Sequence, residues 1–199
     1  MVRLGLKRIA QGVALALAFP CALVSAFGRL QGMFTVFAHI FAAGPGLPGD
    51  FLRSAYYRLT LTRCSLDTRI SYGTYFVRPH SSIAKLVSIG GYCVIASADI
   101  GEGSQIGSHV LIPGGRHQHT RDAEGNLSSC QHSQVRIGRR CWIGDGAIIM
   151  ADLGADCTIG AGSVVIENIQ DGVVAVGNPA CPLHDRSRLD GERHVCHSS

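Results

Sequence analysis

The stretch CWIGDGAIIMADLGADCTIGAGSVV, residues 141–165, decides the fold, because an aliphatic residue returns in it at a nearly fixed interval. The series runs in steps of six with one step of four: Ile143, Ile149, Leu153, Ile159 and Val165. Gly commonly follows the aliphatic residue, and a small or β-branched residue falls four positions after it. A period of six fits neither an α-helix nor an alternating strand, and it indicates a repeat architecture.

The repeat extends outward on both sides of this stretch. Its positions are Ile83, Ile89, Ile95, Ile100, Ile106, Ile112, Ile137, Ile143, Ile149, Leu153, Ile159, Val165, Ile169 and Ala175. Six residues make one short strand and a turn, and three strands make one triangular coil whose aliphatic residues point to the axis. Stacked coils bury a continuous column, and no coil is stable alone. The sequence therefore predicts an all-β parallel β-helix over residues 65–181.

Composition limits the class of protein. The 199 residues fit one domain with an appendage, and the net charge of +4 comes without a dense basic cluster among aromatics, so a nucleic-acid partner is not expected. Cys93, Cys141 and Cys157 occupy the small slot of the repeat, which suits reduced, buried thiols. The chain has no CxxC pair, so a cysteine-bound metal is not expected either.

The N-terminus is hydrophobic. Residues 9–28 carry no charge, and a second uncharged stretch follows Arg29. We expect residues 1–49 to form a membrane-associating helical segment and residues 50–64 a helical lead-in. The favoured interpretation is a helical hairpin, or a pair of helices, lying in the inner face of the membrane. A tight two-span hairpin and a cleaved signal peptide ending near Ala26 remain open. The predicted location is the cytoplasmic side of a bacterial inner membrane, with a plain cytoplasmic location as the alternative.

The repeat stops between Ile112 and Ile137, where about twenty polar residues intervene. We expect residues 116–134 to protrude as a loop, which a solenoid tolerates and which is commonly functional. His117, His119 and His132 fall inside it. Residues 182–199 lack hexads and are expected to form a tail.

Three short motifs carry a family resemblance: WIG at 142–144, GAGSVV at 160–165 and GNPA at 177–180. With the hexads, they resemble the hexapeptide-repeat acyltransferases, whose fold is a left-handed parallel β-helix. The resemblance is closest to galactoside and maltose O-acetyltransferases and to the O-acetyltransferases of exopolysaccharide and capsule assembly. It implies acetyl-CoA as donor, a sugar or glycolipid acceptor in surface polysaccharide biosynthesis, and a homotrimer with its site between subunits.

The same resemblance implies roles for residues at the loop. His117 would be the general base, because a sugar hydroxyl needs a base near neutrality to attack a thioester, which is typically worth about 10²–10⁴ in rate. His119 would be an alternative base or would orient the acceptor, and Asp122 could hold an imidazole in the right tautomer. Backbone N–H groups of Gly114 or Gly115 could stabilise the oxyanion.

Trp142 would line the cleft beside the acyl-CoA arm, or contact a neighbouring subunit, or do both. The remaining predicted cofactor contacts are Gly144, Ala161, Gly162, Ser163 and Gly177. Two positions depart from the resemblance, because Glu167 and Cys181 stand where the family tends to place basic residues against CoA phosphates. The possible substitutes are Arg139, Arg140, Arg186 and Arg188.

No metal is expected. A zinc site like that of γ-class carbonic anhydrases would use histidines near His80 and His117. The His-Gln-His spacing departs from that pattern, so a zinc-dependent hydratase is the third and least favoured alternative. The main rival is a non-catalytic β-helix scaffold at the membrane, which the altered positions at Glu167 and Cys181 favour.

Overall fold

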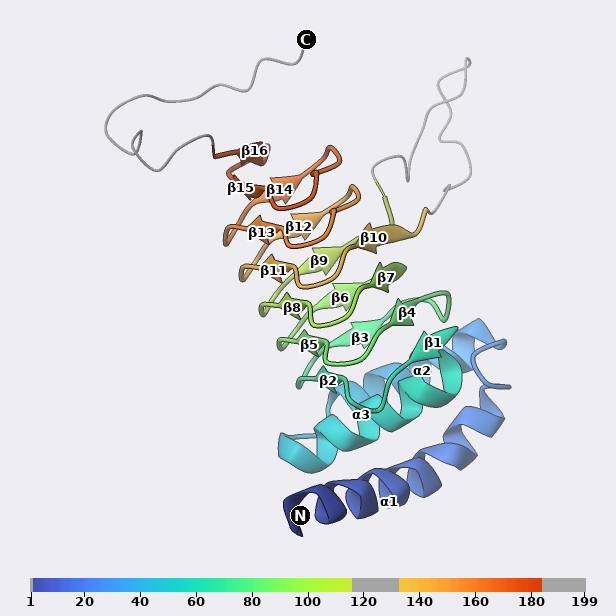
Figure 1. Cartoon of the computed structure of the whole chain (residues 1–199). Helices are drawn as coiled ribbons and strands as arrows, with labels where there is room; N and C mark the ends of the chain where they lie inside the picture. The colour runs from blue at the N-terminus through green and yellow to red at the C-terminus, as the bar shows by residue number, and fades with distance from the viewer. Residues whose placement is uncertain (1, 116–132, 184–199) are drawn as a thin grey trace, which may run out of the picture.

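The computed structural model of the chain describes residues 2–115 and 133–183 (Figure 1). Three helices cover one end of a tapering column of short parallel strands. They are α1 (Val2–Val24), α2 (Gln31–Ala42) and α3 (Gly46–Thr60). The predicted hexapeptide-repeat β-helix with a hydrophobic helical extension is confirmed. His117, His119, Asp122, Arg186 and Arg188 lie outside the described residues.

Three sheets run along the column and enclose its axis. The first sheet contains β1 (Arg63–Cys64), β4 (Ser82–Ile83), β7 (Ala98–Ile100) and β10 (Val135–Ile137). The second contains β2 (Arg69–Ile70), β5 (Ser88–Ile89), β8 (Gln105–Ile106), β11 (Trp142–Ile143), β13 (Thr158–Ile159), β15 (Val174–Val176) and the antiparallel β16 (Cys181–Pro182). The third contains β3 (Tyr75–Phe76), β6 (Val94–Ile95), β9 (Leu111–Ile112), β12 (Ile148–Ile149) and β14 (Val164–Val165).

The repeat residues form the core. Ile89 pairs in register with Ile106, and Ile143 with Ile159, so like side chains stack on the axis. All of these are at least 96% buried. A further coil precedes Ile83, with Cys64, Ile70 and Phe76 as its inward residues.

Each position of the hexad has a structural reason. A Cβ on Gly144, which follows the inward Ile143, would lie 2.5 Å from the backbone nitrogen of Ala161 in the next coil. The third position after the inward residue is left-handed even where it is not Gly, as in Leu86, with a φ of 61°. The fourth position points inward beside the aliphatic column, which explains why Cys93, Cys141 and Cys157 are buried free thiols. Cys181 is disulfide-bonded, so the expectation of reduced thiols does not extend to it.

One edge of the column is irregular. The steps from Ile95 to Ile100 and from Ile149 to Leu153 are shorter than six, and both connect the third sheet to the first. Residues 113–134, which interrupt the repeat, connect β9 to β10 at the same edge. We call this edge the loop corner.

Helices α1, α2 and α3 form a helical cap on the column, and α1 packs its small residues inward. Ala14, Ala18 and Ala22 of α1 are buried, and α1 lies alongside α3. Helix α3 crosses the boundary that we expect between residues 49 and 50. Among the described residues, the stretch 5–24 of α1 is the one helical segment long and apolar enough to cross a membrane. Helix α2 is about 18 Å long, shorter than the ~30 Å hydrocarbon core, which speaks against a two-span hairpin.

Candidate active site

The ends of the interrupting segment are held together at the loop corner. The backbone N–H of Ser133 donates a hydrogen bond to the carbonyl oxygen of Gly114 at 3.0 Å, and its hydroxyl donates to the same oxygen at 3.4 Å. Gly115 has a φ of 95°, and a Cβ there would lie 1.9 Å from the Ser133 Oγ. Residues 116–132 therefore leave and rejoin the solenoid at one point.

This base is tied to the two preceding coils. The Gln134 side chain donates to the carbonyl oxygen of His80 at 3.3 Å, and the Ser97 hydroxyl donates to the same oxygen at 2.6 Å. The backbone N–H of Val135 donates to the carbonyl of Ser97 at 3.2 Å. The loop corner is thus a hydrogen-bonded platform that spans three coils.

Both candidate oxyanion residues are on this platform. Gly114 and Gly115 are buried, with positive φ values of 89° and 95° that are suited to Gly. Within the described part of the chain, the N–H of Gly115 donates no hydrogen bond. A backbone N–H in that state can serve an incoming oxyanion.

Trp142 lies elsewhere. It is on the outer face of the second sheet, flanked in register by Gln105 and Thr158, and is 53% exposed. The second sheet is the side of the triangular column opposite the loop corner. One copy of the chain therefore does not bring Trp142 to Gly114 and Gly115.

The other expected cofactor residues gather at the corner between the second and third sheets. Ala161 and Gly162 are exposed there in one turn, and Gly144 and Gly177 occupy the turns before and after it. Ser163 is fully buried, and its Oγ accepts a hydrogen bond from the N–H of Gly177 at 3.1 Å. Its hydroxyl therefore fixes the turn, whereas Ala161 and Gly162 present an open backbone edge.

The arginines that could bind CoA phosphates differ in whether they are already paired with a carboxylate. The Arg140 guanidinium makes two hydrogen bonds of 2.6 Å to the carboxylate of Asp156, which lowers the pKa of that carboxyl. Arg139 is exposed in the same turn and has no ion pair among the described residues. Glu167 is exposed at the loop corner of the last coil.

Metal ligands do not cluster in the described ranges, 2–115 and 133–183: no three side chains of His, Cys, Asp or Glu converge there. His109 stacks on the ring of Tyr92 with centroids 5.2 Å apart and an interplanar angle of 7°. Tyr92 in turn meets Tyr72 edge to face at 5.5 Å. His109 is therefore part of an aromatic column on the surface and lies away from the loop corner.

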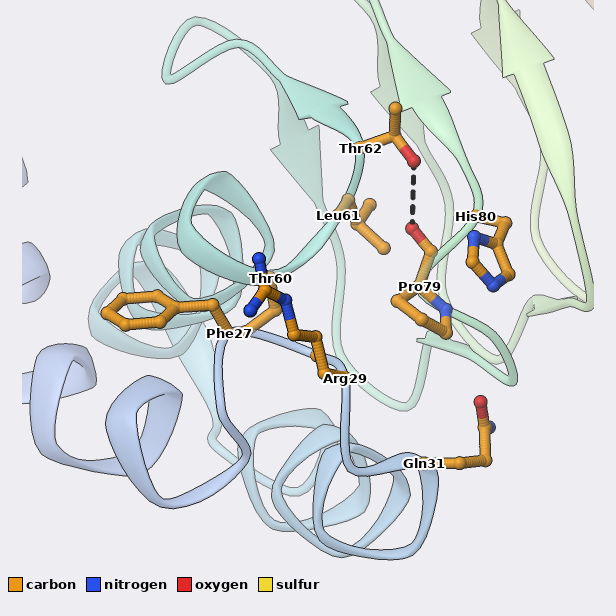
Figure 2. Close-up of a pocket in the computed structure, with 9 residues that line it drawn as sticks. Phe27, Arg29, Gln31, Thr60, Leu61, Thr62, Pro79 and His80 are labelled. Carbon is orange, nitrogen blue, oxygen red and sulfur yellow. Dashed lines mark hydrogen bonds between the residues drawn. The ribbon is translucent and has the colours of Figure 1, made fainter.

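A cavity of about 400 Å³, which no sequence motif indicates, lies at the start of the loop corner. Figure 2 shows it between the α1–α2 turn, the end of α3 and the turn that precedes β4. Its principal lining side chains are Phe27, Arg29, Gln31, Thr62, Pro79 and His80. The isolated charge of Arg29 between two uncharged stretches is the one signal that could have drawn attention to it.

Comparison with curated proteins gives relatives that share part of their length with the chain. The protein named "Putative acetyltransferase YJL218W" from Saccharomyces cerevisiae is 31% identical over 119 residues, which are 58% of this chain and 56% of that protein. The bifunctional protein GlmU of Prochlorococcus marinus (strain MIT 9211) is 25% identical over 126 residues, 59% of this chain and 28% of GlmU. The chain thus spans about half or less of these relatives. No family model matches it.

Among solved structures, a maltose O-acetyltransferase from Clostridium difficile 630 superposes with a TM-score of 0.59 and 21% identity. The match covers 78% of this chain and 87% of that one. At this level of identity the likeness shows that the fold is shared.

Proposed function

We propose that the protein is an acyltransferase that moves an acetyl group from acetyl-CoA to a hydroxyl of a sugar or lipid-linked glycan in surface polysaccharide biosynthesis. The observation that carries this is the platform at the loop corner, where residues 116–132 leave the repeat beside two buried glycines. His117 stands two residues beyond Gly115 and would take the proton of the attacking hydroxyl. His119 would orient the acceptor, and Asp122 the base. The acetyltransferase relatives support this reaction class.

The active unit we propose is a homotrimer. Trp142 and the loop platform lie on opposite sides of one copy, so a cleft that contains both requires a neighbouring subunit. In that cleft, acetyl-CoA would run along the exposed turn at Ala161 and Gly162, with Trp142 beside its arm. No metal takes part in the proposed reaction.

The helical cap would bind the protein to the cytoplasmic side of a membrane. Most of the large apolar residues of α1 face away from the protein, while Ala14, Ala18 and Ala22 face inward. The outward residues, each between 55 and 67% exposed, are Leu6, Ile9, Val13, Leu17 and Leu23. An apolar face of this size on a helix beside a packed domain is typical of interfacial attachment.

The test is acetyl transfer by the full chain, measured as release of free CoA thiol in the presence of a panel of glycan acceptors. We expect His117→Ala to lower the turnover rate by about 10²–10⁴. His132→Ala, in the same segment, is the matched control and should keep the wild-type rate. Equal rates for wild type and His117→Ala would refute the assigned base.

The second candidate function is a non-catalytic scaffold. Glu167 is exposed at the corner where the family tends to place a basic residue, and Arg140 is already paired with Asp156. A scaffold would bind the membrane and release no CoA with any acceptor, whereas the enzyme would release CoA with at least one.

A further inference from the structure

The cavity at the start of the loop corner has a strained, closely packed wall. Ala26 and Phe27 both have left-handed φ values, 48° and 54°, which non-glycine residues seldom adopt. A Cβ on the adjacent Gly28 would lie 2.5 Å from the carbonyl oxygen of Thr60. Strain of this kind persists where the surroundings over-determine it, and it concentrates at binding sites.

The polar lining of the cavity is basic. Within the described part of the chain, the Arg29 guanidinium and the His80 imidazole have neither a hydrogen bond nor an ion pair. Gln31 donates from its side-chain nitrogen to the carbonyl of Val77 at 2.5 Å, which fixes its amide at the rim. None of the described residues lining the cavity is acidic. Arg29 and His80 are both exposed, and their side chains lie on opposite sides of the cavity (Figure 2), so a diphosphate, which carries oxyanions at both ends, matches them better than a single phosphate does.

The opposite edge of the cavity is apolar and continues onto the outer face of the cap. Phe27 lines the cavity and is 44% exposed. Val24 and Leu30, at the two ends of the same turn, are 52% and 53% exposed. A ligand with an anionic group in the cavity and a hydrocarbon chain on these side chains would satisfy both surfaces.

The cavity is also connected to the loop platform. The carbonyl oxygen of His80 accepts hydrogen bonds from both Ser97 and Gln134. The turn at His80 and the point where residues 116–132 leave are two coils apart, which is roughly 10 Å at ~4.8 Å per coil. A sugar attached to a group in the cavity would therefore reach the platform.

We infer that this cavity binds the diphosphate of a prenyl-diphosphate-linked sugar and so positions the acceptor for the proposed reaction. Arg29 and His80 contact the diphosphate oxygens, and the prenyl chain leaves over Phe27 towards the membrane. The inference rests on the proposed function for the acceptor's role, while binding of the diphosphate itself does not. A nucleoside-diphosphate sugar shares the diphosphate but lacks the chain.

The experiment is calorimetry on the full chain in detergent micelles, with micelles alone as the blank. The probes are inorganic diphosphate, uridine diphosphate and farnesyl diphosphate, and acetyl-CoA is titrated into the same preparation. We expect farnesyl diphosphate to bind at least about tenfold more tightly than the other two diphosphates, because only it covers the apolar edge. Arg29→Gln and His80→Gln should each weaken it by about tenfold or more.

Arg58→Gln is the matched control, because Arg58 is exposed on α3 and does not line the cavity. Its affinity should stay within about twofold of wild type. Absence of diphosphate binding, or binding that both cavity variants leave unchanged, would overturn the inference. Tighter binding of uridine diphosphate than of farnesyl diphosphate would overturn the prenyl assignment. Acetyl-CoA binding without diphosphate binding would overturn this inference but not the proposed function. Diphosphate binding without acetyl-CoA binding would overturn the proposed acetyl-CoA-dependent function.

Discussion

The Nε atom of Arg53 donates a 2.8 Å hydrogen bond to the carbonyl oxygen of Ile70, joining α3 to the first coil through a fully buried guanidinium. The same group donates to the carbonyls of Phe41 and Gly44 at the end of α2, and pairs with Asp50. One side chain thus satisfies backbone acceptors from the helical cap and from the solenoid. The Arg53 guanidinium therefore links the helical cap to the solenoid through several hydrogen bonds at one buried point.

Arg53→Met should destabilise the protein by about 3–5 kcal/mol, because it leaves Asp50 and several carbonyls without their buried partner. The measurement is the free energy of unfolding in guanidinium chloride. Arg69→Met is the matched control, since Arg69 pairs with the same carboxylate at 3.2 Å but is 66% exposed. It should cost about 0–1 kcal/mol. Similar losses of unfolding free energy for the two variants would show that the buried contacts of Arg53 contribute no more than an exposed ion pair.

Leu86→Gly should stabilise the protein. Leu86 is left-handed and 62% exposed, so its side chain contributes strain with little burial. Relief of the left-handed strain stabilises the variant by about 1–2 kcal/mol. The greater backbone freedom of Gly in the unfolded chain destabilises it by about 0.5–1 kcal/mol, so the net gain in stability is about 0.5–1 kcal/mol. Arg139→Gly, one position earlier in the equivalent turn of another coil, should destabilise. A lower melting temperature for Leu86→Gly than for wild type would show that the left-handed backbone of Leu86 is not a source of strain.

Stability should fall above pH 9. Burial raises the pKa of the Cys141 thiol from 9.0 to about 11, so the folded protein keeps a neutral thiol that the unfolded chain ionises. This contribution is complete below pH 9 and is lost as the pH rises towards 11. Chemical unfolding at pH 8, 9.5 and 10.5 measures it. Cys141→Ala should show a smaller loss across this range, and an equal loss would contradict the assignment.

Gly115→Ala should impair turnover while acetyl-CoA binding stays within about twofold of wild type. A methyl group there would displace Ser133 and shift the base of residues 116–132, and a misplacement of about 1 Å can cost about 10²-fold in rate. The assay is CoA release under saturating acetyl-CoA. Gly103→Ala controls for strain alone, because Gly103 is also left-handed and its Cβ would meet only the Arg140 side chain at 3.6 Å. A wild-type rate for Gly115→Ala would contradict the role of the platform.

The solenoid is readable in the sequence because each hexad position meets one steric demand. Gly follows the inward residue where the next coil's backbone passes, as at Gly144, and a small residue fills the buried slot, as at Cys141. The predicted β-helix already begins at residue 65, but the series of aliphatic positions begins only at Ile83, because Cys64 and Phe76 occupy inward positions that elsewhere hold aliphatic residues. Periodicity alone does not reveal a coil whose inward residues differ in kind.

The candidate site is only partly readable in the same way. The interruption after Ile112 marks the loop corner, since a repeat that stops must leave the column somewhere. The separation of Trp142 from Gly114 depends on which of the three sheets each hexad belongs to. The steps shorter than six residues make that assignment ambiguous from the sequence. The cavity beside Arg29 and His80 joins segments about 50 residues apart, so the isolated charge of Arg29 is the one local feature that indicates it.

In the proposed reaction the solenoid holds acetyl-CoA and a loop histidine, His117, performs the chemistry. The most direct test of this proposal is calorimetric titration of acetyl-CoA into the full chain, with wild type and His117→Ala measured side by side. We expect binding in the micromolar range for both proteins, with dissociation constants within about twofold of each other, because the imidazole acts on the acceptor hydroxyl. Absence of binding to both would contradict the proposal and would favour the non-catalytic scaffold.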